Sequence, residues 1–210
     1  MKNLILLSAL ILCFASCKKE DDEIAPNANP TTPTITPANN YFKLAVGNYW
    51  VYDDYDVDTN NVATQNSFYD SAYVSSSAII NGNMYYLLHD LFFDEMLRDS
   101  SGFIVDTMGD IRFTNQIFNI PIEFTYYGGN LGYNEQMTLS NQISVAVPAG
   151  TFNAYDWKTI AHFTDPNYPW PPIRYAHSYY ANGVGKVKQI YFYASQPGTI
   201  ERRLNHYHVQ

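Results

Sequence analysis

The chain has 210 residues and a formal net charge of −8. This charge argues against binding to nucleic acid or to an anionic membrane surface, because phosphate groups are held by clustered Lys and Arg side chains. Within residues 41–210, only Arg202-Arg203 approaches such a cluster. Aromatic residues make up 16% of the chain, including 19 Tyr, which favours β-strands over a helical bundle. The length suffices for one domain with its own core.

The first sixteen residues predict a secretory signal peptide. Lys2 precedes an apolar run from Leu4 to Phe14, and the small residues Ala15 and Ser16 follow. As a helix this run spans ~16 Å, roughly half of the hydrocarbon core of a bilayer. It is therefore too short for a membrane anchor, and we expect residues 1–16 to be removed on export.

The end of the apolar run, Phe14-Ala15-Ser16-Cys17, resembles the lipobox of bacterial lipoprotein signal peptides. The resemblance implies that Cys17 receives a diacylglyceryl group, becomes the mature N-terminus and carries the acyl chains, palmitate among them, that anchor the protein. Cys13 lies inside the run and is expected to leave with the signal peptide. The alternative is a secreted protein with a free Cys17. A lipidated chain has no disulfide and depends on its core.

Residues 17–40 predict a tether between the lipid and the domain. The charged run Lys18–Glu23 resembles export signals that follow the lipidated cysteine in lipoproteins of the Bacteroidota. The resemblance implies an outer-membrane location at the cell surface. The alternative is a solvated tether that carries no export signal. Residues 24–40 hold four prolines among Thr, Asn and Ala, which is typical of a semi-extended linker. The tether reaches at most ~80 Å.

Residues 41–210 predict a single all-β domain. Short alternating segments separated by turn residues favour about eleven strands in an antiparallel meander, curled into a barrel or a curved half-barrel. Asn81-Gly82 is the strongest hairpin turn, because this pair accepts positive φ angles. The predicted strands are Tyr49–Val57, Ser67–Ser75, Met84–Leu91, Phe103–Thr107, Ile111–Phe118, Ile122–Tyr127, Gln136–Val147, Ala154–Phe163, Tyr175–Tyr180, Lys186–Tyr193 and Ile200–Tyr207.

Three blocks of the domain, at 41–52, 147–152 and 183–188, look like blocks that recur in uncharacterised lipid-anchored lipoproteins of the Bacteroidota. They include Gly47-Asn48-Tyr49-Trp50, Val147-Pro148-Ala149-Gly150 and Gly183-Val184-Gly185. Some members of this group are similar in fold to the curved-sheet carriers of lipoproteins in the periplasm. The resemblance implies a half-barrel with a lipid-sized hollow, and it implies little about activity.

Two patterns are candidates for metal binding. Asp54, Asp56 and Asp58 begin a D-x-D-x-D-x-N sequence like that of a calcium loop, but Thr59 and Gln65 replace the required Gly and Glu. An exposed strand end is the other interpretation. His206 and His208 share a strand face, yet no third ligand is evident. We therefore expect neither a metal nor a cofactor.

The loop 165–172 is the most distinctive surface candidate. Four prolines stiffen it, so the loop should lose little conformational entropy on binding. We therefore expect Tyr168 and Trp170 to bind a sugar or a protein partner. In the alternative arrangement, the loop folds back and Trp170 covers one end of the barrel.

No nucleophile motif such as G-x-S-x-G or H-E-x-x-H is present in the sequence. We therefore expect a non-catalytic domain at the outer membrane or cell surface. Its ligand is a small molecule, glycan or protein, bound on a tyrosine-rich concave face or at loop 165–172. The alternatives are a hydrolase of surface glycans, and a structural or assembly component of the envelope.

Overall fold

The computed structural model describes residues 37–91, 93–116, 122–126, 133–165 and 167–210, without the side chains of residues 68, 69, 122–126 and 133. The predicted signal peptide, Cys17 and nearly all of the tether lie outside the described residues. The short helix α1 (Asn39–Phe42) spans the predicted boundary between tether and domain at residue 40. Among the described residues, no helix is long and apolar enough to span a bilayer.

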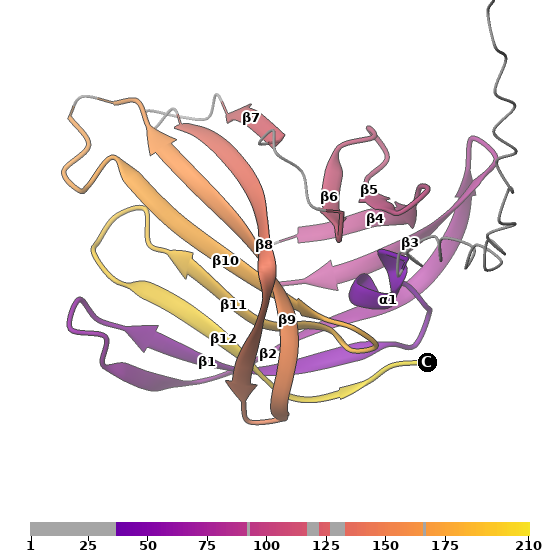
Figure 1. Ribbon diagram of the computed structural model, residues 1–210, viewed down its shortest axis with the longest axis horizontal. Coiled ribbons are helices and arrows are strands. Elements are labelled where there is room, and N and C mark those ends of the chain that lie inside the picture. The colour runs from indigo at the N-terminus through magenta and orange to yellow at the C-terminus, as the bar shows by residue number, and fades with distance from the viewer. Residues whose placement is uncertain (1–36, 92, 117–121, 127–132, 166) are drawn as a thin grey trace, which may run out of the picture. The chain divides into compact units, whose positions relative to one another are not determined.

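The described part of the domain is an antiparallel β-structure of twelve strands (Figure 1). The strands are β1 (Tyr49–Val57), β2 (Ala63–Ile80), β3 (Asn83–Asp90), β4 (Phe93–Asp99), β5 (Phe103–Val105), β6 (Ile111–Thr114), β7 (Ile122–Tyr126), β8 (Tyr133–Val147), β9 (Gly150–Phe163), β10 (Ile173–Ala181), β11 (Gly185–Phe192) and β12 (Thr199–His208). The predicted all-β class is confirmed, and every predicted strand overlaps an observed one. β4 is the strand that the sequence pattern missed.

The strand order in the sheet is β6-β5-β4-β3-β2-β1-β12-β11-β10-β9-β8-β7. The chain therefore forms two six-stranded meanders, and the first and last strands join them. Along this seam Tyr49 of β1 pairs with His208 of β12, and Val57 pairs with Thr199. The Asn81-Gly82 turn between β2 and β3 has the positive φ angles predicted for it, 49° and 77°.

The sheet curls without closing. Phe113 of β6 stands nine positions from β9 in the strand order, yet its ring centroid lies 5.7 Å from that of Trp157 on β9. It lies 4.5 Å from the ring of Tyr180 on β10. The β6 end of the sheet thus packs back onto the opposite half. The curved half-barrel predicted from the sequence is confirmed.

The inner face of the curl is filled by a hydrophobic core. Helix α1 brings Tyr41 and Phe42 onto this face, where Phe42 stacks on Tyr180 at 5.4 Å. The inner tyrosines Tyr52 and Tyr180 are buried, at 1% and 5% exposure. The cavity that remains beside Phe42 has a volume of about 20 Å³, enough for one water molecule. This cavity is far smaller than the lipid-sized hollow that the carrier resemblance implies.

Candidate functional site

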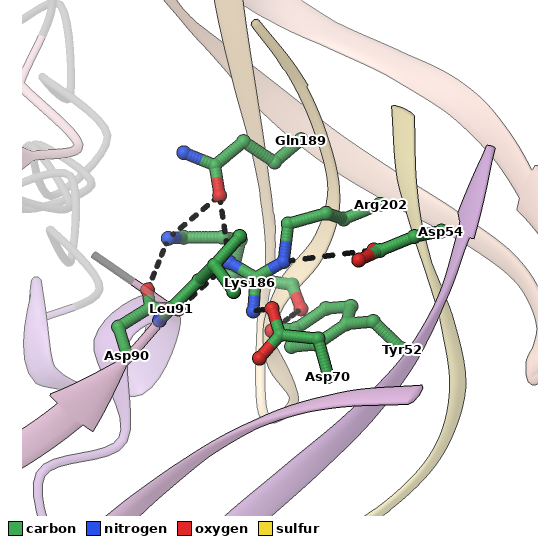
Figure 2. Close-up of polar contacts among 8 residues, drawn as sticks. All are labelled: Tyr52, Asp54, Asp70, Asp90, Leu91, Lys186, Gln189 and Arg202. Carbon is green, nitrogen blue, oxygen red and sulfur yellow. Dashed lines mark hydrogen bonds and ion pairs between the residues drawn. The ribbon is translucent and has the colours of Figure 1, made fainter. Parts of the chain in front are cut away.

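A cluster of buried charges lies on the inner face beside the hydrophobic core (Figure 2). Alternation along the strands places Trp50, Tyr52 and Asp54 of β1 on this face. The neighbouring strands add further polar groups at the same level. The cluster consists of Tyr52, Asp54, Asp70 on β2, Asp90 on β3, Lys186 and Gln189 on β11, and Arg202 on β12.

Arg202 is the centre of the cluster and is 1% exposed. Its Nη1 donates to Asp90 at 2.7 Å and to Gln189 at 3.0 Å. Its Nη2 is ion-paired with Asp70, and its Nε lies 4.0 Å from Asp54. One guanidinium therefore links both meanders, because its carboxylate partners stand on β1, β2 and β3.

Lys186 and Tyr52 complete the cluster. Lys186 Nζ donates to Asp90 at 2.9 Å and to Gln189 at 3.3 Å. The Tyr52 hydroxyl donates to the backbone carbonyl of Lys186 at 2.9 Å, and the guanidinium of Arg202 lies 4.5 Å from the centre of the Tyr52 ring. The Tyr52 ring and the Arg202 guanidinium are therefore both buried and in contact with each other.

Three carboxylates face two cations, and their pKa values differ accordingly. Burial raises the pKa of Asp54 to about 6, although Arg202 opposes this shift. Burial also raises the pKa of Asp70 against the effect of Arg202. Burial acts in the same direction on Asp90, but the charges of Lys186 and Arg202 outweigh it and hold its pKa below the usual range.

The carboxylates of this cluster are largely shielded from solvent by the described residues. The side chains of Asp54, Asp70 and Asp90 are 8–10% exposed. A glycosidase needs two carboxylates that flank a bound sugar. The contacts of Arg202 with Asp70 and Asp90 link the two meanders.

The three aspartates of the D-x-D-x-D-x-N pattern do not converge on one point. Asp54 joins the buried cluster, and Asp56 accepts a hydrogen bond from Tyr193. Asp58 accepts from the backbone N–H groups of Asn60 and Val62 and caps a turn. Only Asp58 fits the exposed strand end proposed as the alternative. No group of three potential metal ligands occurs among the described residues.

The outer face of the sheet carries a groove with a volume of about 370 Å³. Glu201 lines it, and its chain neighbour Arg202 points to the opposite face. The walls combine apolar, aromatic and polar side chains from four adjacent strands and the flanking loops. The lining residues are Val57, Asn61, Pro171, Ile173, Arg174, Tyr175, His177, Ile190, Phe192, Thr199 and Glu201.

Glu201 and His177 of the groove pair with charged side chains of the protein, whereas Arg174, which also lines the groove, donates to the backbone carbonyl of Gly198 at 3.2 Å. Glu201 accepts hydrogen bonds from Arg203, and Lys188 lies 3.0 Å from the same carboxylate. Although burial opposes it, these contacts lower the pKa of Glu201. His177 Nδ1 lies 2.9 Å from Asp156. Arg174 has no carboxylate partner among the described residues, so the groove carries a positive charge.

The loop 165–172 adjoins this groove through Pro171. Tyr168 stacks on Phe163 at 4.1 Å, and its hydroxyl donates to the carbonyl of Ala194 at 3.1 Å. Trp170 is half-buried, and its indole Nε1 is shielded from solvent. Tyr168 thus packs against the domain, and Trp170 is partly covered.

The predicted histidine pair lies at the exposed end of the seam. The Tyr49 ring stacks on His208 at 5.8 Å and meets His206 edge-on at 6.3 Å. Within the part of the chain that the structure describes, no third metal ligand joins them. These histidines belong to an aromatic surface.

Sequence comparison places the chain in no known family: no family model and no curated protein matches it. Two solved structures resemble the fold. A protein described as a "putative lipoprotein" from Parabacteroides distasonis is 13% identical, with a TM-score of 0.50 over 80% of this chain and 98% of that one. A "putative exported protein" with a YmcC-like fold from Bacteroides fragilis is 13% identical over the same shares, with a TM-score of 0.43. The first shows a shared fold, from which activity does not follow.

Proposed function

We propose that the chain is a lipid-anchored lipoprotein of the Bacteroidota, held on the outer membrane by Cys17. Its β-domain binds a neutral glycan in the groove between β1 and β10 without acting on it. The lipobox-like Phe14–Cys17 and the fold shared with a protein described as a putative lipoprotein support the anchor. The groove is the observation that supports binding.

The chemistry of the groove favours a sugar over a cationic ligand. A pyranose ring has apolar C–H faces and a rim of hydroxyl groups, so its binding site needs flat apolar surfaces beside donors and acceptors. Tyr175 is 48% exposed, with Lys158 Nζ 4.4 Å from the centre of its ring, and Ile173 next to it is 43% exposed. Asn61 and Thr199 supply neutral polar groups. Because Glu201 is already paired, a cationic ligand gains no free carboxylate there.

Membrane fractionation tests the anchor. Cys17→Ala is expected to move the protein from the membrane fraction to the soluble periplasmic or secreted fraction, because two or three acyl chains are lost. Cys13→Ala is the matched control and should stay with the membrane. A Cys17→Ala protein that remains membrane-bound contradicts the proposal. Protease treatment of intact cells then separates surface display, in which the domain is digested, from a periplasmic orientation.

Titration with neutral oligosaccharides tests the groove. The probes are hexasaccharides of glucose, mannose and xylose, measured by calorimetry with the full-length lipidated protein in detergent. Tyr175→Ala should weaken the binding of the preferred probe at least tenfold. Phe93→Ala removes an aromatic residue of similar exposure, 55%, from β4 and should bind as the wild type does. Equal affinities of the two variants, or no binding by any probe, would refute the glycan site.

A further inference from the structure

Three side chains on adjacent strands form a hydrogen-bonded Ser–His–Asp chain that the sequence did not reveal. The Ser75 hydroxyl on β2 lies 2.7 Å from Nε2 of His89 on β3. His89 Nδ1 lies 2.7 Å from Asp94 Oδ1 on β4. A hydroxyl, an imidazole and a carboxylate in this order and at these distances are the parts of a serine nucleophile with its general base.

The partners of His89 define where its proton lies. An ionised carboxylate only accepts hydrogen bonds, so Asp94 requires the proton on Nδ1. In the neutral ring the lone pair is then on Nε2, which accepts the hydrogen bond from Ser75. This is the tautomer in which imidazole removes a proton from a serine hydroxyl.

The sheet holds these groups in place. His89 pairs directly with Asp94 across β3 and β4, and with Tyr73 across β2 and β3. The Tyr73 ring stacks on the imidazole at 4.5 Å and an interplanar angle of 19°. Ser75 is the extra residue of a β-bulge, since Val74 pairs with Leu88 and Ser76 with Leu87. Bulges re-aim side chains and occur next to active sites.

The Ser–His–Asp chain is separate from the glycan groove and accessible from solvent. The Asp94 side chain is 60% exposed, and Ser75 is also exposed. Tyr73 and Tyr49, 43% and 40% exposed, extend a flat surface from His89 along the same row of strands. Because Ser75 and Asp94 are exposed, a site of this kind suits a short acyl group carried on a larger molecule.

We propose that Ser75, His89 and Asp94 catalyse acyl transfer from accessible carboxylic esters to water. Ser75 Oγ attacks the ester carbonyl carbon while its proton passes to His89 Nε2. The bond from that carbon to the alcohol oxygen breaks, and the alcohol leaves with the proton. Water then attacks the acyl-serine and returns a proton through His89 to Ser75 Oγ, which releases the carboxylic acid. Ser75 and His89 are the catalytic residues, and Asp94 positions the ring.

A fluorophosphonate probe with the full-length lipidated protein tests the nucleophile, because it labels activated serines covalently. Mass spectrometry is expected to find the label on Ser75. Ser75→Ala and His89→Gln should abolish labelling and lower the hydrolysis of p-nitrophenyl acetate about 100-fold. Ser77→Ala, an exposed serine of the same strand, is the control and should keep both activities. Absence of label on Ser75, or equal hydrolysis by Ser75→Ala and Ser77→Ala, overturns the proposal.

Asp94 requires a separate measurement, since its removal could act through structure. Asp94→Asn places an amide donor at Nδ1 and reverses the tautomer, so labelling should slow while the unfolding temperature changes little. Asp94→Glu keeps the carboxylate and should restore a measurable part of the rate. Equal rates for the Asn and Glu variants exclude the positioning role. Neither result bears on glycan binding, which Tyr175→Ala tests independently.

Discussion

Arg202 on β12 donates a 2.7 Å hydrogen bond to Asp90 on β3, although β1 and β2 lie between these strands in the sheet. Adjacent strands are separated by about 4.8 Å, so three steps across a flat sheet cover about 14 Å. The contact exists because the sheet curls and both side chains reach toward its inner face. The ion pair thus depends directly on the curvature.

Loss of the Arg202 guanidinium should destabilise the domain severely. In Arg202→Met, Asp70 and Asp90 remain buried without their shared cation, and breaking a buried ion pair in this way costs about 3–5 kcal/mol. Arg203→Met is the matched control, because Arg203 is partly exposed and pairs with Glu201 on the other face. Its cost should be about 1 kcal/mol or less. Urea unfolding of both variants measures the difference, and similar losses would contradict a structural role of the cluster.

Stability should depend on pH through Asp54. The pKa of Asp54 is about 6 in the folded protein, against 3.8 for an unperturbed carboxyl, because the side chain is buried. Between these pH values the folded state binds more protons than the unfolded state. The free energy of unfolding therefore falls as pH rises from about 4 to 6.

Asp54→Asn cannot ionise and should flatten this dependence. Part of the decrease in stability with rising pH should remain in this variant, since burial also raises the pKa of Asp70. At pH 7 the variant should be as stable as the wild type or more stable by ~1 kcal/mol, after allowance for solvent screening. Asp58→Asn is the control. Hydrogen bonds from Val62 and Asn60 lower the pKa of Asp58, so the loss of this carboxyl should change the pH dependence of stability only below about pH 4. An unchanged slope in Asp54→Asn, measured by thermal unfolding from pH 4 to 7, would disprove the assignment.

Gly198 should not tolerate a side chain. Its φ angle is 96°, and a Cβ atom there would lie 2.7 Å from the backbone carbonyl oxygen of Val57. Gly198→Ala should therefore lose about 2–3 kcal/mol from strain and the clash together. Gly82→Ala, with a φ of 77° and no atom within 4 Å, isolates the strain and should lose about 1 kcal/mol. Equal losses in chemical denaturation would show that the contact at Val57 relaxes.

Strand β4 shows where local pattern fails as a predictor. Its sequence, FDEMLRD, is largely charged and does not alternate clearly between apolar and polar residues. In the structure Leu97 is fully buried, and the polar side chains find partners on neighbouring elements. Glu95 pairs with Arg112 at 3.0 Å, and Arg98 donates to the Tyr85 hydroxyl at 3.1 Å. Long-range pairing stabilises a strand that propensity alone disfavours.

The all-β class, the hairpin at Asn81-Gly82 and the approximate positions of eleven strands could be predicted from sequence, because alternation and turn preference depend on a few adjacent residues. The lipobox-like segment at Cys17 is equally local. The contacts of Arg202, the row from Ser75 to Asp94 and the outer groove could not be predicted in this way. They join residues on different strands, and their contacts depend on strand register, on a bulge at Ser75 and on the curl of the sheet. Those properties arise when the whole sheet assembles, since a shift of one residue turns each side chain to the other face.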